Sequence, residues 1–196
     1  MEKLKISTIF YSIQGEATHT GEASIFIRLY GCNLDCSFCD DLLHKDKNSI
    51  SEYTYRQVLE ELKQFSSKNI IITGGEASIY NLNEFIDFLH KYGYYISIET
   101  NGFNFSNIKN ADWITYSPKD WQNIDENHCS EFKFIVNSNT NIDPILNLDT
   151  NKPIYIQPEN YIETPNMDNI EHCIKLVKKY PQFKLSVQMH KFLGVL

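Results

Sequence analysis

Hydrophobic positions along the chain follow two different periods. Runs rich in β-branched and aromatic residues, such as Ile6–Ile13 and Ser24–Tyr30, are typical of strands. Asn69–Thr73 is an almost continuous apolar run, which predicts a strand buried on both faces. Elsewhere apolar residues recur three and four positions apart. This spacing predicts a helix over Thr54–Phe65, with Thr54 as its N-cap.

Strand-like and helix-like segments alternate along the rest of the chain. Helices are expected over Leu82–Tyr92, where Gly93 ends the pattern, and over Met167–Tyr180. The Asn-rich stretch Phe103–Asn110 is expected to be a surface loop. Further strands are expected at Tyr94–Glu99, Trp113–Tyr116, Phe132–Val136, Ile154–Gln157 and Lys184–Val187. The alternation predicts βαβ units, a mostly parallel sheet and one domain over residues 1–196.

Polar residues gather where four of these strands end. The four clusters are Thr73–Glu76, Glu99–Gly102, Ser117–Lys119 and Gln157–Glu159. In parallel α/β sheets and barrels, ligands bind at the carboxyl ends of the strands. We therefore expect these clusters to line one rim of a barrel-like sheet and to form a single site there.

Composition and charge narrow the classes of partner. The net charge of −7 argues against general binding to nucleic acid, which requires clustered Lys and Arg, so a small-molecule substrate is favoured. The chain contains no apolar run near the roughly 18 residues of a membrane span. Reduced cysteines without a targeting segment predict a cytoplasmic location.

Three cysteines, Cys32, Cys36 and Cys39, follow the spacing C-x3-C-x2-C. Iron–sulfur clusters are normally held by four thiolates. Three on one short loop favour a [4Fe–4S] cluster whose fourth iron has no protein ligand. Because an open coordination position is typical of a catalytic metal site, we expect a small molecule to bind there.

Other states of these cysteines stay open from their spacing alone. With His44 they would form a Cys3His zinc site, although structural zinc sites usually pair their ligands in two separate knuckles. They could also be unliganded thiols. Disulfides are disfavoured because five cysteines is an odd number. Cys129 is expected to be a bystander, and Cys173, at helical spacing with apolar residues, a core thiol.

Sequence blocks across almost the whole chain resemble those of one known family. The first are Ser12–Glu16 (S-I-Q-G-E) and Phe26–Asp40 (F-I-R-L-x-G-C-N-L-x-C-x-x-C-D). Shorter blocks follow: T-G-G-E, E-T-N-G, S-P-K, E-x-K-F-I-V, Q-P-E-N and the closing Q-x-H-K-x-L-G. Together they resemble the 7-carboxy-7-deazaguanine synthase family of the radical S-adenosylmethionine (SAM) enzymes, which serves queuosine and deazapurine synthesis. The cysteine loop alone would indicate only the superfamily.

The resemblance implies a role for each matching residue. The three clustered cysteines would ligate a [4Fe–4S] cluster whose open iron takes SAM, the source of a 5′-deoxyadenosyl radical. Arg28 would pair with a substrate carboxylate. The residues that would bind SAM are Gly75, Glu76, Ser117, Pro118, Lys119, Gln157, Pro158, Glu159 and Asn160. Those expected at the substrate are Ile13, Gln14, Gly15, Arg28, Thr73, Gln188, His190 and the chain-end carboxylate of Leu196.

The implied reaction is a radical ring contraction. It converts 6-carboxy-5,6,7,8-tetrahydropterin to 7-carboxy-7-deazaguanine with loss of ammonia and regenerates SAM. Mg²⁺ would organise the substrate carboxylate. Where the family usually has Ser or Thr near this ion, the chain has Asp41, which we expect to bind Mg²⁺ more firmly; the competing outcome is that Asp41 turns away and the metal is lost. Ala17 and Ala77 replace a Gly and a Pro common in the family.

The resemblance also implies the architecture and the partners. We expect a partial TIM-like barrel of about six mostly parallel strands, because the chain is short for a full barrel of roughly 250 residues. A homodimer partner or the C-terminus would help to close it. An electron donor such as flavodoxin or ferredoxin would reduce the cluster. The rivals are an activase that installs a glycyl radical on a partner protein and a zinc-stabilised adaptor; neither has a reason to carry all of these blocks.

Overall fold

The computed structural model describes residues 3–41 and 43–195, which contain one nine-stranded sheet of order β3-β1-β2-β4-β5-β6-β7-β8-β9. β2 and the strands from β4 to β9 run parallel to one another, whereas β1 is antiparallel to both β2 and β3. The strands are β1 (Lys3–Ile13), β2 (Ala23–Leu29), β3 (Ser51–Thr54), β4 (Asn69–Gly74), β5 (Tyr95–Thr100), β6 (Trp113–Tyr116), β7 (Glu131–Val136), β8 (Ile154–Pro158) and β9 (Phe183–Leu185).

Five α-helices and four short 3₁₀ helices connect the described strands. The predicted cap of the first helix is confirmed, because the Thr54 hydroxyl accepts from the Gln57 amide while the Gln57 side chain accepts from the Thr54 amide. The α-helices are α1 (Tyr55–Leu62), α2 (Asn83–His90), α3 (Asp143–Leu146), α4 (Met167–Lys179) and α5 (His190–Leu193). The 3₁₀ helices are η1 (Leu43–Lys45), η2 (Lys47–Ser49), η3 (Ala77–Ile79) and η4 (Phe105–Asn107).

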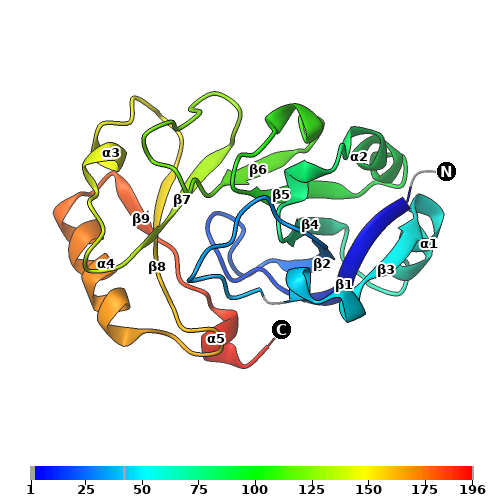
Figure 1. The fold of residues 1–196 in the computed structure, drawn as a ribbon, viewed down its shortest axis with the longest axis horizontal. Helices are drawn as coiled ribbons and strands as arrows, with labels where there is room; N and C mark the ends of the chain where they lie inside the picture. Colours follow the sequence, from blue (N-terminus) through cyan, green and yellow to red (C-terminus); the bar gives the residue numbers. More distant parts are fainter. Residues whose placement is uncertain (1–2, 42, 196) are drawn as a thin grey trace.

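The sheet is curved but open, because β3 and β9 are its two edges and do not pair with each other. This confirms the expected partial barrel, with seven mutually parallel strands where about six were expected. Figure 1 shows α1 and α2 at one end of the sheet and α4 beside β8 and β9 at the other. The short elements β3, α3 and α5 and the four 3₁₀ helices were not predicted, and β9 spans Phe183–Leu185 rather than the expected Lys184–Val187. Segments of three or four residues are too short to show a period.

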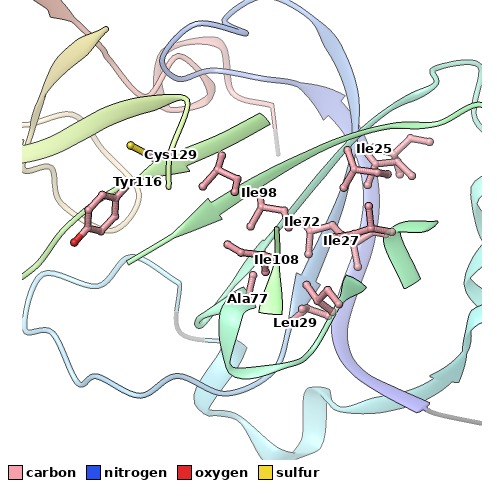
Figure 2. Packing of buried hydrophobic residues seen from close by; sticks show 14 of the residues in the cluster. Ile25, Ile27, Leu29, Ile72, Ala77, Ile98, Ile108, Tyr116 and Cys129 are labelled. Carbon is pink, nitrogen blue, oxygen red and sulfur yellow. The ribbon is translucent and has the colours of Figure 1, made fainter. Parts of the chain in front are cut away.

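The outer face of the sheet carries the hydrophobic core. Ile27, Ile72 and Ile98 lie side by side on β2, β4 and β5 and are fully buried, as Figure 2 shows. Leu62 of α1 and Phe85 of α2 belong to the same buried cluster. Side chains alternate between the two faces of a strand. The residues before and after each of these isoleucines therefore point to the inner face.

The inner face carries polar side chains that are buried or partly buried. Glu99 of β5, Thr115 of β6, Lys133 of β7 and Gln157 of β8 each alternate with a core residue of the same strand. Buried polar groups of this kind require partners, and each of the four has a hydrogen bond within the barrel. The interior of the barrel is therefore lined by many polar side chains together with apolar ones such as Phe26 and Ile71.

Candidate active site

A cavity of about 250 Å³ opens at the carboxyl ends of the parallel strands. It is lined by nearly every residue that the sequence indicated, from the cysteine loop to Gln188 and His190. Pro118 borders a neighbouring hollow beside Cys36 and Lys119 instead, and Leu196 lies outside the described residues. The four polar clusters thus do share one rim, while the role of each residue stays a prediction.

The cysteine loop follows β2 directly and covers one side of the cavity. Cys32, Cys36 and Cys39 are partly buried free thiols that all line it. Burial raises the pKa of the Cys32 and Cys39 thiols above the ordinary value. Within the described residues no three His, Cys, Asp or Glu side chains lie close enough together for a single metal ion. A cubane cluster sets a different requirement, because each sulfur binds a different iron.

Two glycines join the loop to the next strand. The Gly75 amide donates to the Leu29 carbonyl at 3.1 Å and the Glu76 amide donates to the Gly31 carbonyl at 2.8 Å. A Cβ on Gly74 would collide with the Leu29 backbone, and one on Gly75 with the Gly31 backbone. Gly74 also has φ of 118°, which disfavours any other residue. The glycine pair therefore allows the end of β4 to lie against the start of the cysteine loop.

Glu76 connects this junction to β5. Its buried carboxylate accepts from the Thr100 hydroxyl at 2.5 Å, the Asn101 amide at 2.6 Å and the Ser78 amide at 2.9 Å. Three donors make this carboxylate a rigid part of the rim. Its predicted contact with SAM would use the remaining acceptor positions on the cavity side.

Ser117 and Lys119 follow β6. The Lys119 ammonium donates to the Ser117 carbonyl at 2.9 Å and to the Ser117 hydroxyl at 2.6 Å. Burial and then the charge of Lys133 lower the pKa of Lys119 to about 8. A nearby carboxylate would favour the charged form, so this lysine suits an anionic group in the cavity.

The C-terminal segment closes the far side of the cavity. The Gln188 side chain accepts from the Asn160 amide group at 3.0 Å and donates to the Asp40 carboxylate at 2.7 Å. Lys191 of α5 reaches the same Asp40 oxygen at 3.2 Å. The segment thereby links the end of β8 to the cysteine loop. Gly15 lies under it, since a Cβ there would be 3.0 Å from the Met189 nitrogen.

Arg28 and Thr73, paired across β2 and β4, occupy the predicted substrate side. The Arg28 guanidinium lies 3.4 Å from the Asp41 carboxylate and 5.6 Å from the centre of the Phe10 ring. Phe10 stacks on Phe26 with ring centres 4.9 Å apart, and both rings line the cavity. The structure thus places Asp41 beside the group expected to bind the substrate carboxylate.

One buried cluster of charges was missed by the sequence reasoning. Lys133 forms ion pairs with Glu16 and Glu99, the latter at 2.5 Å, and Gln14 donates to Glu99 at 3.3 Å. All four residues line the cavity. Gln14 was expected at the substrate, whereas Glu16, Glu99 and Lys133 belong to matching blocks but were given no role. The available signal was the alternation of charged and apolar residues along β5 and β7.

A family model described as the Radical SAM superfamily matches residues 26–148. Members of this superfamily use a [4Fe–4S] cluster and SAM. The cavity fits both groups, because three thiols on one loop face a space lined by buried polar side chains. Cys32, Cys36 and Cys39 would hold the cluster. The zinc alternative that the spacing left open is not needed.

Curated relatives match over almost their full length. The 7-carboxy-7-deazaguanine synthase of Bacteroides thetaiotaomicron is 34% identical over 191 residues, covering 97% of this chain and 98% of its own. That of Haemophilus influenzae is 34% identical over 209 residues, covering 97% and 93%. A crystal structure of QueE from Escherichia coli superposes with a TM-score of 0.74 at 24% identity, over 95% of this chain and 94% of that one, and so supports the fold. The chain belongs to the 7-carboxy-7-deazaguanine synthase family of the radical SAM superfamily.

Proposed function

We propose that this chain converts 6-carboxy-5,6,7,8-tetrahydropterin to 7-carboxy-7-deazaguanine with loss of ammonia. The observation that carries the proposal is that one cavity joins the three cysteines to Arg28 and Thr73. A radical source and a group that binds carboxylates therefore meet in the same space. The names of the full-length relatives support the same reaction.

In this proposal the residues around the cavity have different roles. When bound, the cluster and SAM supply a 5′-deoxyadenosyl radical that takes a hydrogen atom from the substrate. Arg28 binds the substrate carboxylate as a bidentate partner, and the aromatic pair Phe10 and Phe26 lies beside it. Gln188 and His190 cover the cavity and exclude water from the reacting atoms.

SAM is proposed to bind along the rim formed by the ends of β4, β6 and β8. In this proposal Glu76 and the backbone of Gly75 bind its amino group and Lys119 binds its carboxylate; all three residues line the cavity. The turn at the end of β8 completes this side: Glu159 is held there by the Asn137 amide group at 2.9 Å. The roles of Ser117, Pro118, Gln157, Pro158 and Asn160 in this subsite are proposals of the same kind.

Mg²⁺ is proposed to bind at Asp41 and to share the substrate carboxylate with Arg28. The support is the position of Asp41 on the cavity wall, 3.4 Å from Arg28. A carboxylate oxygen is a hard ligand that suits this ion. Because Arg28 already pairs with Asp41, the metal would bind together with the substrate, whose own carboxylate compensates the added charge.

The proposed physiological setting follows from the reaction. An electron donor such as flavodoxin or ferredoxin would approach the exposed side of the cysteine loop, where Leu34 and Phe38 are more than a third exposed. A homodimer and a cytoplasmic location remain proposals, the latter supported by five free thiols. Among the described residues no helix is long and apolar enough to cross a membrane.

The test is anaerobic reconstitution with iron and sulfide, followed by incubation with the carboxy-tetrahydropterin, SAM and a reductant. We expect deazaguanine product with little net consumption of SAM. Formation of 5′-deoxyadenosine in proportion to reductant, without a pterin-derived product, would refute the proposed substrate.

The metal proposal has its own experiment. Asp41→Thr restores the residue type common in the family and should raise the Mg²⁺ concentration needed for half-maximal activity. Asp41→Asn is the matched control, since it keeps the size of the side chain and removes its charge. Equal Mg²⁺ dependence in all three proteins would show that Asp41 does not bind the ion.

A further inference from the structure

The ammonium of Lys133 lies between two carboxylates inside the barrel. Lys133 stands on the inner face of β7 and its side chain is 6% exposed; the side chains of Glu16 and Glu99 are 15% and 16% exposed. Glu16 follows β1, and Glu99 lies on β5. One cation thus joins three separate parts of the chain. The small exposed fraction of each carboxylate faces the cavity.

The charges of this cluster do not balance. Two carboxylates and one ammonium leave one negative charge in a space that is shielded from water. Although burial opposes it, Lys133 lowers the pKa of Glu16 to about 2. Burial raises the pKa of Glu99 in spite of Lys133, and the two carboxylates hold the pKa of Lys133 well above its usual value. Such an arrangement persists best when a ligand supplies further donors to the carboxylates.

Other charged groups face this cluster from several elements. His190 of α5 and Lys119 after β6 act on it from the cavity side, and Glu131 acts on Glu99 from deeper in the barrel. Glu131 has its own partners, the hydroxyls of Thr115 at 2.7 Å and Thr18 at 2.5 Å, and does not line the cavity. The Glu16–Lys133–Glu99 cluster is therefore the anionic part of the cavity wall, and Glu131 is its buried neighbour.

The proposed substrate carries complementary groups. Its carboxylate suits Arg28 on β2, four strands along the sheet from Lys133 on β7. The amino and lactam nitrogens of its pyrimidine ring are N–H donors and suit carboxylate acceptors. Hydrogen bonds to charged groups are the stronger ones, and a site built on them rejects analogues that lack the donor. The distribution of charge along the wall therefore orients the ring.

We propose that Lys133 is a positioning residue that holds Glu16 and Glu99 as a paired acceptor for the N–H edge of the substrate's pyrimidine ring. This inference rests on the proposed function. Lys133 itself does not take part in the radical chemistry. It keeps two mutually repelling carboxylates ionised and close together, so that both face the same ligand edge.

The test uses reconstituted Lys133→Met, which keeps the length of the side chain and removes its charge. We expect the KM for the carboxy-tetrahydropterin to rise by about tenfold or more, the equivalent of one hydrogen bond to a charged group. The affinity for SAM, measured by equilibrium binding, should not change. Without the ammonium, the carboxylates retain protons more readily. The KM of the variant should therefore fall as the pH rises from about 6 to about 8, whereas that of the wild type should stay flat.

Two further variants separate positioning from structure. Lys133→Arg retains the cation and should restore most of the pterin affinity. Glu131→Gln is the matched control, because it alters a buried carboxylate two residues earlier on the same inner face but outside the cavity; we expect its KM to equal that of the wild type. A pterin KM in Lys133→Met that is unchanged, or that rises only in step with weaker SAM binding, would overturn the inference.

A folding failure of Lys133→Met leaves the inference testable. Glu16→Gln and Glu99→Gln each keep Lys133 paired with one carboxylate, and each should weaken pterin binding without weakening SAM binding. Normal pterin KM values in both would equally overturn it. The wild type, assayed in parallel, distinguishes a failure of the proposed function from a failure of the proposed role of Lys133. If it does not convert the pterin, the proposed function fails; if it does and the variants bind the pterin normally, only the role of Lys133 fails.

Discussion

The two faces of the parallel strands follow the same geometry and serve opposite purposes. On the outer face Ile27, Ile72 and Phe132 are fully buried against helices and other apolar residues. On the inner face of the same strands, Arg28, Thr73 and Lys133 line a cavity. The outer face stabilises the fold through apolar area, which is insensitive to direction. The inner face depends on placed charges and hydrogen bonds, which are sensitive to it.

A side chain's contribution to folding stability and its role in the site are therefore distinct properties in this protein. The inner face keeps charged groups in a barrel interior, where each requires a partner or a ligand. Substitutions on the outer face should therefore change stability with little effect on the chemistry. Those on the inner face should change substrate binding or turnover, and they should change stability where they remove a charge that pairs with another.

The largest difference is expected between two cysteine substitutions, one of which removes turnover while the other lowers stability. Cys36→Ala should abolish cluster-dependent turnover and leave the stability of the cluster-free protein almost unchanged, because Cys36 is partly exposed. Cys173 lies on the buried face of α4 and belongs to the core. Cys173→Ala should keep the cluster absorbance and activity and cost about 1 kcal/mol of unfolding free energy. Iron content, turnover and urea unfolding measure both. Cluster-dependent turnover in Cys36→Ala equal to that of the wild type would show that Cys36 is not needed for the chemistry.

Substitutions of Phe132 test the contribution of the outer face to stability. Phe132 is fully buried on β7 next to Lys133. Phe132→Ala should cost about 3–5 kcal/mol of unfolding free energy, because it leaves a large cavity. Phe132→Leu should cost less, since most of the volume remains. In either variant, the protein that stays folded should keep the wild-type KM for the pterin. A change in KM without a loss of stability would show that the two faces are coupled.

The charge cluster predicts a pH-dependent difference in stability. Glu16 has a pKa of about 2 in the folded protein against 4.5 for the free group, so its contribution to stability is present above pH 4.5 and is lost as the pH falls towards 2. The difference of 2.5 units (4.5 less 2) corresponds to at most about 3 kcal/mol. Glu16→Gln lacks this contribution, so its unfolding free energy should change less than that of the wild type between about pH 5 and about pH 3.

Urea unfolding of the cluster-free protein at these two pH values measures the effect. Glu84→Gln on α2 is the control, because Glu84 is exposed and distant in sequence from the cluster. Parallel losses in all three proteins would show that Glu16 is not stabilised by Lys133.

The smallest effect is expected at Ala17. This buried residue has φ of 54°, in the left-handed region that glycine adopts without strain. Ala17→Gly should relieve roughly 1–2 kcal/mol of strain and lose part of it again with the buried methyl group. A net gain of about 0.5 kcal/mol is expected in urea unfolding. A loss instead would mean that the methyl contact outweighs the backbone strain.

Local patterns were sufficient for much of the fold. The long strands and the three longer helices were predicted within a few residues, because the apolar period and the caps lie in the segments themselves. The Asn-rich stretch is a connection, as expected, although its Ile108 is buried in the core. The elements that were missed, β3, α3 and α5, are held by their neighbours and have no period of their own.

The chemical groups available to this protein can be read from its residues alone: three thiols on one loop, an arginine, and polar clusters after the strands. Which of these groups lie in contact depends on the folded arrangement of the strands. The pairing of Asp41 with Arg28, and of Lys133 with Glu16 and Glu99, joins residues that are 13, 117 and 34 positions apart. Period and propensity describe neighbours along the chain, whereas these contacts depend on how the strands are ordered and curved across the open barrel.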